Sequence, residues 1–111
     1  MPYQRERGTG SIVHVASRQG LEPAAGVATY AVSKAALVQL TRVLDLELRP
    51  LGIRVNAVAP QLLNTATTRS FLTPDVLAHA VLPEAVADII AYLVSDAAAP
   101  VSGAIVPAYG P

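Results

Sequence analysis

The sequence predicts an α/β protein in which a doubly wound parallel sheet of about three strands is flanked by helices. Hydrophobic residues make up 52% of the 111 residues and charged residues only 14%, a composition typical of a folded protein. Short β-branched runs alternate with longer segments of helical periodicity, an order typical of strands and helices packed in layers. We therefore expect residues 1–111 to form a single domain.

The first strand is expected at residues 12–16, where the sequence Ile-Val-His-Val-Ala is almost continuously apolar. Such a run is typical of a buried parallel strand. The preceding Gly8-Thr9-Gly10 comes before a strand and lacks a third glycine, so we interpret it as a turn and not as a phosphate-binding loop. A long helix is predicted at about 28–48, ended by Pro50 and Gly52. Its apolar face carries Leu37, Leu40, Leu44 and Leu48.

The second half of the chain predicts two more strands and two more helices. A strand at 53–59 is stopped by Pro60, and strand, helix and strand together form a right-handed βαβ unit. Thr73-Pro74 opens a short helix to about Ala80, and Pro83 opens another. The third strand is expected at 104–106. The inner face of the helix after Pro83 carries Val86, Ile89, Ile90 and Leu93.

The charges argue against several classes of function. Eight Lys and Arg residues balance eight Asp and Glu residues, which leaves no basic field for nucleic acid or for an anionic membrane surface. There is no cysteine, so thiolate metal sites are excluded and a reducing cytoplasm is compatible. No apolar run approaches the length of a membrane span. We expect a cytoplasmic protein that binds no metal, nucleic acid or membrane.

The only lysine of the chain, Lys34, lies four residues after Tyr30, a spacing that places both side chains on one face of a helix. A phenol ordinarily ionises near pH 10, and a nearby ammonium favours its ionised form. The pair is therefore a candidate for acid/base chemistry. Chance placement of four tyrosines would produce this spacing about 4% of the time, so the pair alone does not decide the matter.

Ser17 ends the first predicted strand, and ligands collect at the carboxyl ends of parallel strands. Because the helix with Tyr30 and Lys34 follows this strand, all three polar groups are expected to converge at one edge of the sheet. The histidines have no plausible metal partners: His14 is interpreted as a hydrogen-bonded residue of the strand and His79 as a surface residue. Asn56 is expected to hold backbone groups together within its strand.

Ser17, Tyr30 and Lys34 resemble the pattern of the short-chain dehydrogenase/reductase family: a serine at a strand end, a tyrosine thirteen residues later, and a lysine four beyond that. Arg54-Val55-Asn56-Ala57-Val58-Ala59-Pro60 is similar to the family's next strand. Thr65 matches the threonine five residues past that proline. The resemblance covers nearly the whole chain but only the C-terminal half of a family member, so it implies a partial Rossmann-like fold without the N-terminal half.

The resemblance implies transfer of a hydride between NAD or NADP and a small alcohol or carbonyl substrate. Ser17 would hold the substrate oxygen, Tyr30 would transfer the proton, and Lys34 would assist Tyr30 and bind the nicotinamide ribose. Three further residues, Pro60, Leu63 and Thr65, would line the nicotinamide. The resemblance also implies a homo-oligomer. It does not identify the substrate or choose between NAD and NADP.

The sequence departs from the family pattern in three places. It contains no glycine-rich phosphate loop, so we expect poor cofactor affinity and an isolated chain that is inactive and marginally stable or oligomeric. Gln61 replaces the glycine that usually follows the family's proline. The segment between Thr65 and Pro83 is shorter than the family's substrate loop by on the order of ten residues, and such loops set specificity. Two alternatives to an oxidoreductase stay open: a non-catalytic oligomerisation module and a degraded gene product.

Overall fold

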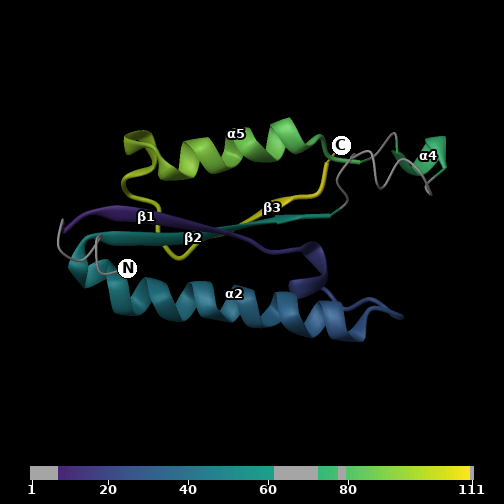
Figure 1. Cartoon of the computed structure of the whole chain (residues 1–111), viewed down its shortest axis with the longest axis horizontal. Coiled ribbons are helices and arrows are strands. Elements are labelled where there is room, and N and C mark those ends of the chain that lie inside the picture. Colours follow the sequence, from purple (N-terminus) through teal and green to yellow (C-terminus); the bar gives the residue numbers. More distant parts are fainter. Residues whose placement is uncertain (1–7, 62–72, 78–79, 111) are drawn as a thin grey trace.

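The computed structural model describes residues 8–61, 73–77 and 80–110. Three parallel strands form its sheet in the order β1-β2-β3, with bounds Gly10–Val15, Ile53–Pro60 and Ile105–Ala108. The long helix α2 (Ala28–Leu48) covers one face of the sheet and α5 (Pro83–Val94) covers the other (Figure 1). The predicted layers and parallel strands are thus confirmed.

The shorter elements join these layers. The 3-10 helix η1 (Arg18–Gly20) follows β1, η2 (Arg49–Leu51) follows α2, and η3 (Asp96–Ala98) follows α5. The short helix α4 (Pro74–Leu77) begins at the predicted proline. Because consecutive parallel strands are linked through α2, the carboxyl ends of β1 and β2 lie at the same edge of the sheet.

The central strand β2 carries the core. Seven of its eight residues are buried, and only Arg54 is partly exposed. On the α2 side, Ala16, Val38, Ala57 and Ala59 form one buried cluster, in which small side chains bring the helix close to the sheet. On the α5 side, Val58, Val81 and Val86 form another, flanked by Ile89 and Ile90. The predicted inner face of α5 is therefore confirmed.

The predicted apolar face of α2 is partly wrong. Leu48 is buried and Leu37 and Leu44 are half-buried, but Leu40 is 45% exposed. The helix instead buries Val38, Thr41, Asp45 and Leu48. Thr41 tolerates burial because its hydroxyl donates to the Leu37 carbonyl oxygen (2.9 Å) and contacts His14 Nδ1 (2.9 Å). Since the single Thr41 proton goes to Leu37, His14 Nδ1 is the donor in the second bond.

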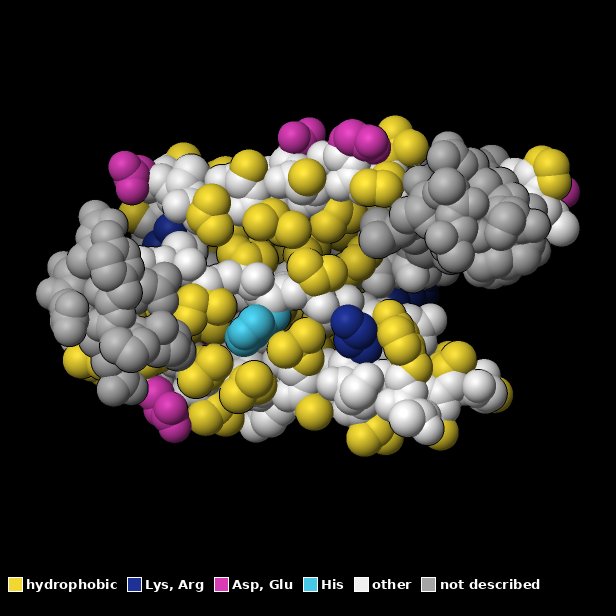
Figure 2. Space-filling model, viewed as in Figure 1, with side chains coloured by type: hydrophobic (Ala, Val, Ile, Leu, Met, Phe, Trp, Pro, Cys, Tyr) yellow, Lys and Arg dark blue, Asp and Glu magenta, His cyan; other side chains and the backbone are white. Residues whose placement is uncertain are grey.

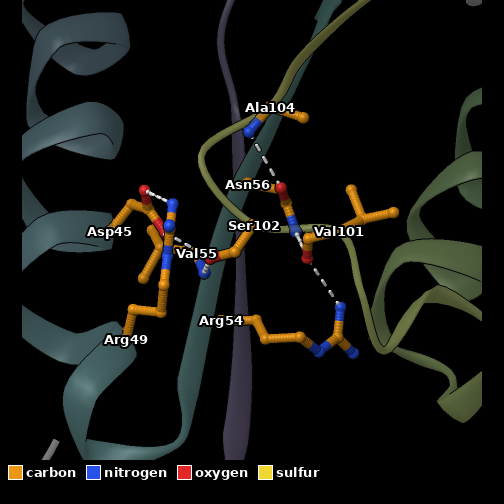
Figure 3. A network of polar contacts seen from close by, with 8 residues as sticks. All are labelled: Asp45, Arg49, Arg54, Val55, Asn56, Val101, Ser102 and Ala104. Atoms are coloured by element: carbon orange, nitrogen blue, oxygen red, sulfur yellow. Dashed lines mark hydrogen bonds and ion pairs between the residues drawn. The ribbon is translucent and has the colours of Figure 1, made fainter.

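A polar network fixes the loop before β3 against α2 and β2 (Figure 3). The fully buried Asn56 donates from Nδ2 to the Val101 carbonyl oxygen (3.1 Å) and accepts from the Ala104 N–H (3.0 Å). This confirms its predicted backbone-binding role. Ser102 accepts from the Val55 N–H (3.1 Å) and donates to Asp45. The network therefore connects segments more than forty residues apart in sequence.

Asp45 lies at the helix end of this network. It is also ion-paired with Arg49, the residue that follows α2 directly. Burial alone raises the pKa of an aspartate, but the hydrogen bonds from Arg49 and Ser102 outweigh it and lower the pKa of Asp45 below its ordinary value. Asp45 is consequently a charged contact between α2 and the loop that leads into β3.

Candidate active site

Lys34 connects α2 to the carboxyl end of β1. Its Nζ donates a hydrogen bond to the backbone oxygen of Val15 (3.2 Å), the last residue of that strand. The same Nζ lies 5.7 Å from the centre of the Tyr30 ring, within the range of a cation–π contact. Tyr30 is 48% exposed. The structure thus places Lys34 between Tyr30 and the end of the strand that leads to Ser17.

Ser17 lies directly behind this strand end and is almost fully buried. It occupies the N-cap position of η1, where its Oγ accepts from the backbone N–H of Gln19 (3.3 Å). Its hydroxyl also contacts Gln19 Oε1 at 2.5 Å. A short polar side chain is favoured at such a cap because it satisfies an N–H without a helical partner. The cap therefore fixes the direction of the Ser17 hydroxyl.

Gly20 allows η1 to pack directly on the helix that carries Lys34. A Cβ atom at this position would lie 2.8 Å from both the backbone carbon and the backbone oxygen of Lys34. Any larger residue would have to push η1 and α2 apart. The close approach fixes the Ser17 segment relative to Lys34, and sequence reasoning gave no sign of it.

The predicted cofactor-binding residues are only partly described. Pro60 is buried at the end of β2, where it is paired in register with Ala108 of β3. Leu63 and Thr65 lie outside the described residues, as does His79. Ser17 and Pro60 therefore lie at the ends of the neighbouring strands β1 and β2, and Lys34 of α2 contacts the end of β1.

Arg18 and Tyr109, which the sequence reasoning missed, lie at the same edge of the sheet. Arg18 Nη1 donates to Gln61 Oε1 (2.8 Å), and its guanidinium carbon lies 4.5 Å from the centre of the Tyr109 ring. Arg18 is also ion-paired with Glu22. The hydrogen bond that Arg18 donates within this pair raises the pKa of Arg18 above its ordinary value. Arg18, Gln61 and Tyr109 each follow a strand end closely, and that shared position was the signal in the sequence.

Within residues 8–61, 73–77 and 80–110, no group of three or more His, Cys, Asp and Glu side chains is placed to hold a metal ion. In the same part of the chain, no helix is both long and apolar enough to cross a membrane.

The comparisons with known proteins agree with this architecture. A family model described as enoyl-(acyl carrier protein) reductase matches residues 1–110. Protein FixR of Bradyrhizobium diazoefficiens is 46% identical over 113 residues, which cover 92% of this chain and 39% of FixR. The 4-formylbenzenesulfonate dehydrogenase of Comamonas testosteroni is 34% identical, with coverage of 93% of this chain and 46% of the enzyme.

Among solved structures, 4-hydroxyisoleucine dehydrogenase complexed with NADH superimposes with a TM-score of 0.89 and 29% identity, covering 98% of this chain and 49% of that one. The likeness confirms the Rossmann-like fold class. The chain spans less than half the length of each of these three proteins. From the matching family model, the relatives and the shared fold, we conclude that this chain belongs to the short-chain dehydrogenase/reductase family.

Proposed function

We propose that residues 1–111 form a single domain that is the catalytic half of an NAD(P)-dependent oxidoreductase acting on a small alcohol or carbonyl compound. The observation that carries this proposal is the position of Lys34, which contacts both the Tyr30 ring and the strand end next to Ser17. Family membership indicates the reaction class, and Ser17, Tyr30 and Lys34 would provide the side chains that carry out the reaction. We also propose a cytoplasmic location, with which the lack of cysteine is compatible.

The residues at this edge fit the nicotinamide-ribose end of such a cofactor. The Lys34 ammonium has three donors, and among the described residues its hydrogen bond to the Val15 oxygen uses one of them, which leaves two for ribose hydroxyls. Pro60, Leu63 and Thr65 are the proposed residues of the nicotinamide side. When bound, the cofactor would supply or accept the hydride. Because the sequence has no glycine-rich phosphate loop, we expect residues 1–111 alone to bind it weakly.

Ser17 is proposed to hold the substrate oxygen. Its single hydroxyl proton is directed at Gln19 Oε1 (2.5 Å), so this proton has to be released before Ser17 can donate to a substrate. Rotation of the Gln19 amide by half a turn achieves this, because the amide nitrogen then donates to Oγ. The Ser17 proton becomes available where negative charge develops on the substrate oxygen.

Tyr30 is proposed to move the proton. Its side chain is 48% exposed, so a substrate can reach its hydroxyl. It would donate a proton to the substrate oxygen during reduction and remove one during oxidation. The Nζ of Lys34, one helical turn away, lies 5.7 Å from the centre of the ring, where it would assist this proton transfer.

A non-catalytic oligomerisation module is the second candidate. It is favoured by the apolar residues that α2 exposes, since Val32 is 69% and Leu46 72% exposed, together with Leu40 and Val43. Exposed apolar stretches often mark contacts between proteins. The two candidates are compatible if homo-oligomer formation accompanies catalysis, and they differ in whether a substrate is turned over.

The test is hydride transfer by a hybrid enzyme. Residues 1–111 replace the matching segment of the Comamonas testosteroni dehydrogenase, so that the glycine-rich half expected from the family is restored. Oxidation of 4-formylbenzenesulfonate and of a panel of small alcohols is followed at 340 nm with NAD and with NADP. The proposal predicts cofactor-dependent turnover. A hybrid that folds and binds the cofactor, but oxidises none of these compounds, would favour the oligomerisation module.

A further inference from the structure

A small cavity of about 260 Å³ lies between η1, the loop after it and the end of β2, and most of its lining residues are polar or charged. Its lining residues are Arg18, Gln19, Glu22, Pro23, Ala24 and Gln61. The volume is below the usual range for a cavity that takes a whole small molecule. It suits a single substituent of a ligand whose remainder lies outside. Since the Cα atoms of Ser17 and Arg18 are about 3.8 Å apart, a substituent here would lie near the reacting end of a bound substrate.

Arg18 is the cation of this cavity, and groups from three segments hold it. Gln61, just after β2, accepts from Nη1 at 2.8 Å, and the Tyr109 ring, just after β3, lies 4.5 Å from the guanidinium carbon. Glu22 accepts from Nε. A planar guanidinium held in this way is ready to bind a carboxylate or sulfonate with two parallel hydrogen bonds.

Arg18 has donors left for such a ligand. Within the described residues 8–61, 73–77 and 80–110, its hydrogen bonds use Nε and Nη1, whereas a guanidinium has five N–H donors. The Nη2 group can therefore receive an anion without breaking the contact with Gln61.

Glu22 is the anion that now neutralises Arg18. The two residues are four positions apart, with Arg18 at the start of η1 and Glu22 just beyond its end, and 37% of the Arg18 side chain and 50% of the Glu22 side chain are exposed. Exposed pairs of this kind contribute little to stability. An incoming anion can consequently displace the Glu22 carboxylate, whereas a neutral group has no charge with which to compete.

We propose that Arg18, oriented by Gln61 and Tyr109, binds an anionic substituent of the substrate, a carboxylate or a sulfonate, in place of Glu22. The enzyme would then prefer alcohols or carbonyl compounds that carry a negative group within a few bonds of the reacting carbon. Calling this ligand a substrate rests on the proposed function. The anion site itself rests on the cavity and on the contacts of Arg18.

The test measures binding and not turnover. The 111-residue chain, labelled with 15N arginine, is titrated with 4-formylbenzoate and with 4-formylbenzamide, which has the same shape without the charge. The Arg18 Nε resonance reports occupancy. We expect saturation by the acid, with binding of the amide at least tenfold weaker. Equal binding of the two compounds would overturn the proposal.

Four variants separate anion binding from a purely structural role of Arg18. R18M should weaken acid binding at least tenfold and R18K by a smaller factor, while R42M on the exposed side of α2 should leave it unchanged. E22Q should tighten it several-fold, because the competing carboxylate is lost. Weaker binding in E22Q, or unchanged binding in a folded R18K or R18M, would show that Arg18 only holds the strand ends together.

The outcome is independent of the oxidoreductase assignment. Selective binding of the acid by a chain whose hybrid enzyme shows no hydride transfer would leave the anion site in place and remove the proposed reaction. Turnover by the hybrid, together with equal binding of the acid and the amide, would leave the proposed reaction in place and remove the anion site.

Discussion

The Lys34 ammonium donates a hydrogen bond to the backbone oxygen of Val15 at 3.2 Å. The next residue, Ala16, donates its N–H to Val58 of β2 (2.8 Å). Because alternate residues of a strand face opposite sides in the sheet plane, the Val15 carbonyl points away from β2. The Lys34 Nζ therefore lies on the open side of β1. Its hydrogen-bond partner there is an uncharged carbonyl group, so the contact does not neutralise the ammonium beside Tyr30.

Replacement of Gly20 by alanine should disturb this arrangement. The added Cβ would lie 2.8 Å from the Lys34 backbone carbon and oxygen, so η1 and α2 have to separate. We expect a loss of about 1–3 kcal/mol in the free energy of unfolding, measured by urea denaturation. Turnover by the hybrid enzyme should fall with it. Ala24→Ser, in the exposed loop that follows, is the control, and equal stability of the two variants would contradict the close packing.

Arg54 should be a major contributor to stability. Its Nη1 donates to the carbonyl oxygens of Leu93, Ala98 and Val101, and Nη2 donates to that of Ser95. These carbonyls lie at the end of α5 and in the turn after it, where helical partners are missing. Arg54→Met keeps the apolar stem but removes all four bonds, and should cost about 2–3 kcal/mol.

The matched control for Arg54 is Arg42→Met on the exposed side of α2. This change should alter the free energy of unfolding by less than about 0.5 kcal/mol. Equal effects of the two substitutions in urea titrations would show that the carbonyl contacts of Arg54 contribute nothing.

Asp45 should make stability depend on pH in the acid range. Burial opposes its ionisation, but the hydrogen bonds from Arg49 and Ser102 hold its folded-state pKa below the ordinary value. The unfolded chain therefore binds the proton more readily. The contribution of Asp45 is complete above the unfolded pKa, near 4, and is lost as the pH falls through the lower folded value.

The measurement for Asp45 is the urea midpoint between pH 6 and pH 2.5. Asp45→Asn should be less stable by about 1–2 kcal/mol at pH 6, and should lose less stability than the unsubstituted chain on acidification. A constant difference between the two proteins at all pH values would contradict the pKa direction.

The chain should associate through the open edge of β1. This strand is an edge of the described sheet and its residues are half-exposed or exposed. Hydrophobic side chains gather along the face between α5 and α2 (Figure 2). Unpaired apolar edges associate readily, and the zero net charge offers little repulsion. Light scattering after gel filtration should therefore show a mass above that of one chain.

Two substitutions locate that association. By the same alternation that turns Val15 outward, the Val13 N–H points away from β2, so Val13→Pro removes an edge donor without breaking the β1–β2 ladder. It should shift the mass toward the monomer. Val32→Ser, on the exposed surface of α2, should not. The opposite result would assign association to the helix.

The elements were predictable because their patterns are local. The bounds of α2 follow from its propensities and from Pro50 and Gly52, and the strand positions follow from β-branched runs. The inward side of α2 was not predictable, because Thr41 and Asp45 are buried in exchange for hydrogen bonds with His14 and Ser102, 27 and 57 residues away. A local pattern of leucines contains no information about hydrogen-bond partners so far away in the sequence.

The candidate site, too, could be predicted only where its signal is local in the sequence. Ser17, Tyr30 and Lys34 are candidates because of their spacing along one strand and one helix, and Lys34 contacts the end of that strand through the Val15 oxygen. Arg18 and Tyr109 were missed because their contact joins the ends of β1 and β3, 91 positions apart in the numbering. Gln19 was missed because only the cap geometry of η1 turns its side chain toward Ser17.

The central claim is that Tyr30 moves the proton, and Tyr30→Phe in the hybrid enzyme tests it most directly. The phenylalanine keeps the ring but has no proton to transfer. Loss of a general acid or base usually costs about 10²–10⁴-fold, so kcat should fall at least 100-fold while the dissociation constant of the reduced cofactor stays within about twofold. A kcat within threefold of the unsubstituted hybrid would contradict the claim.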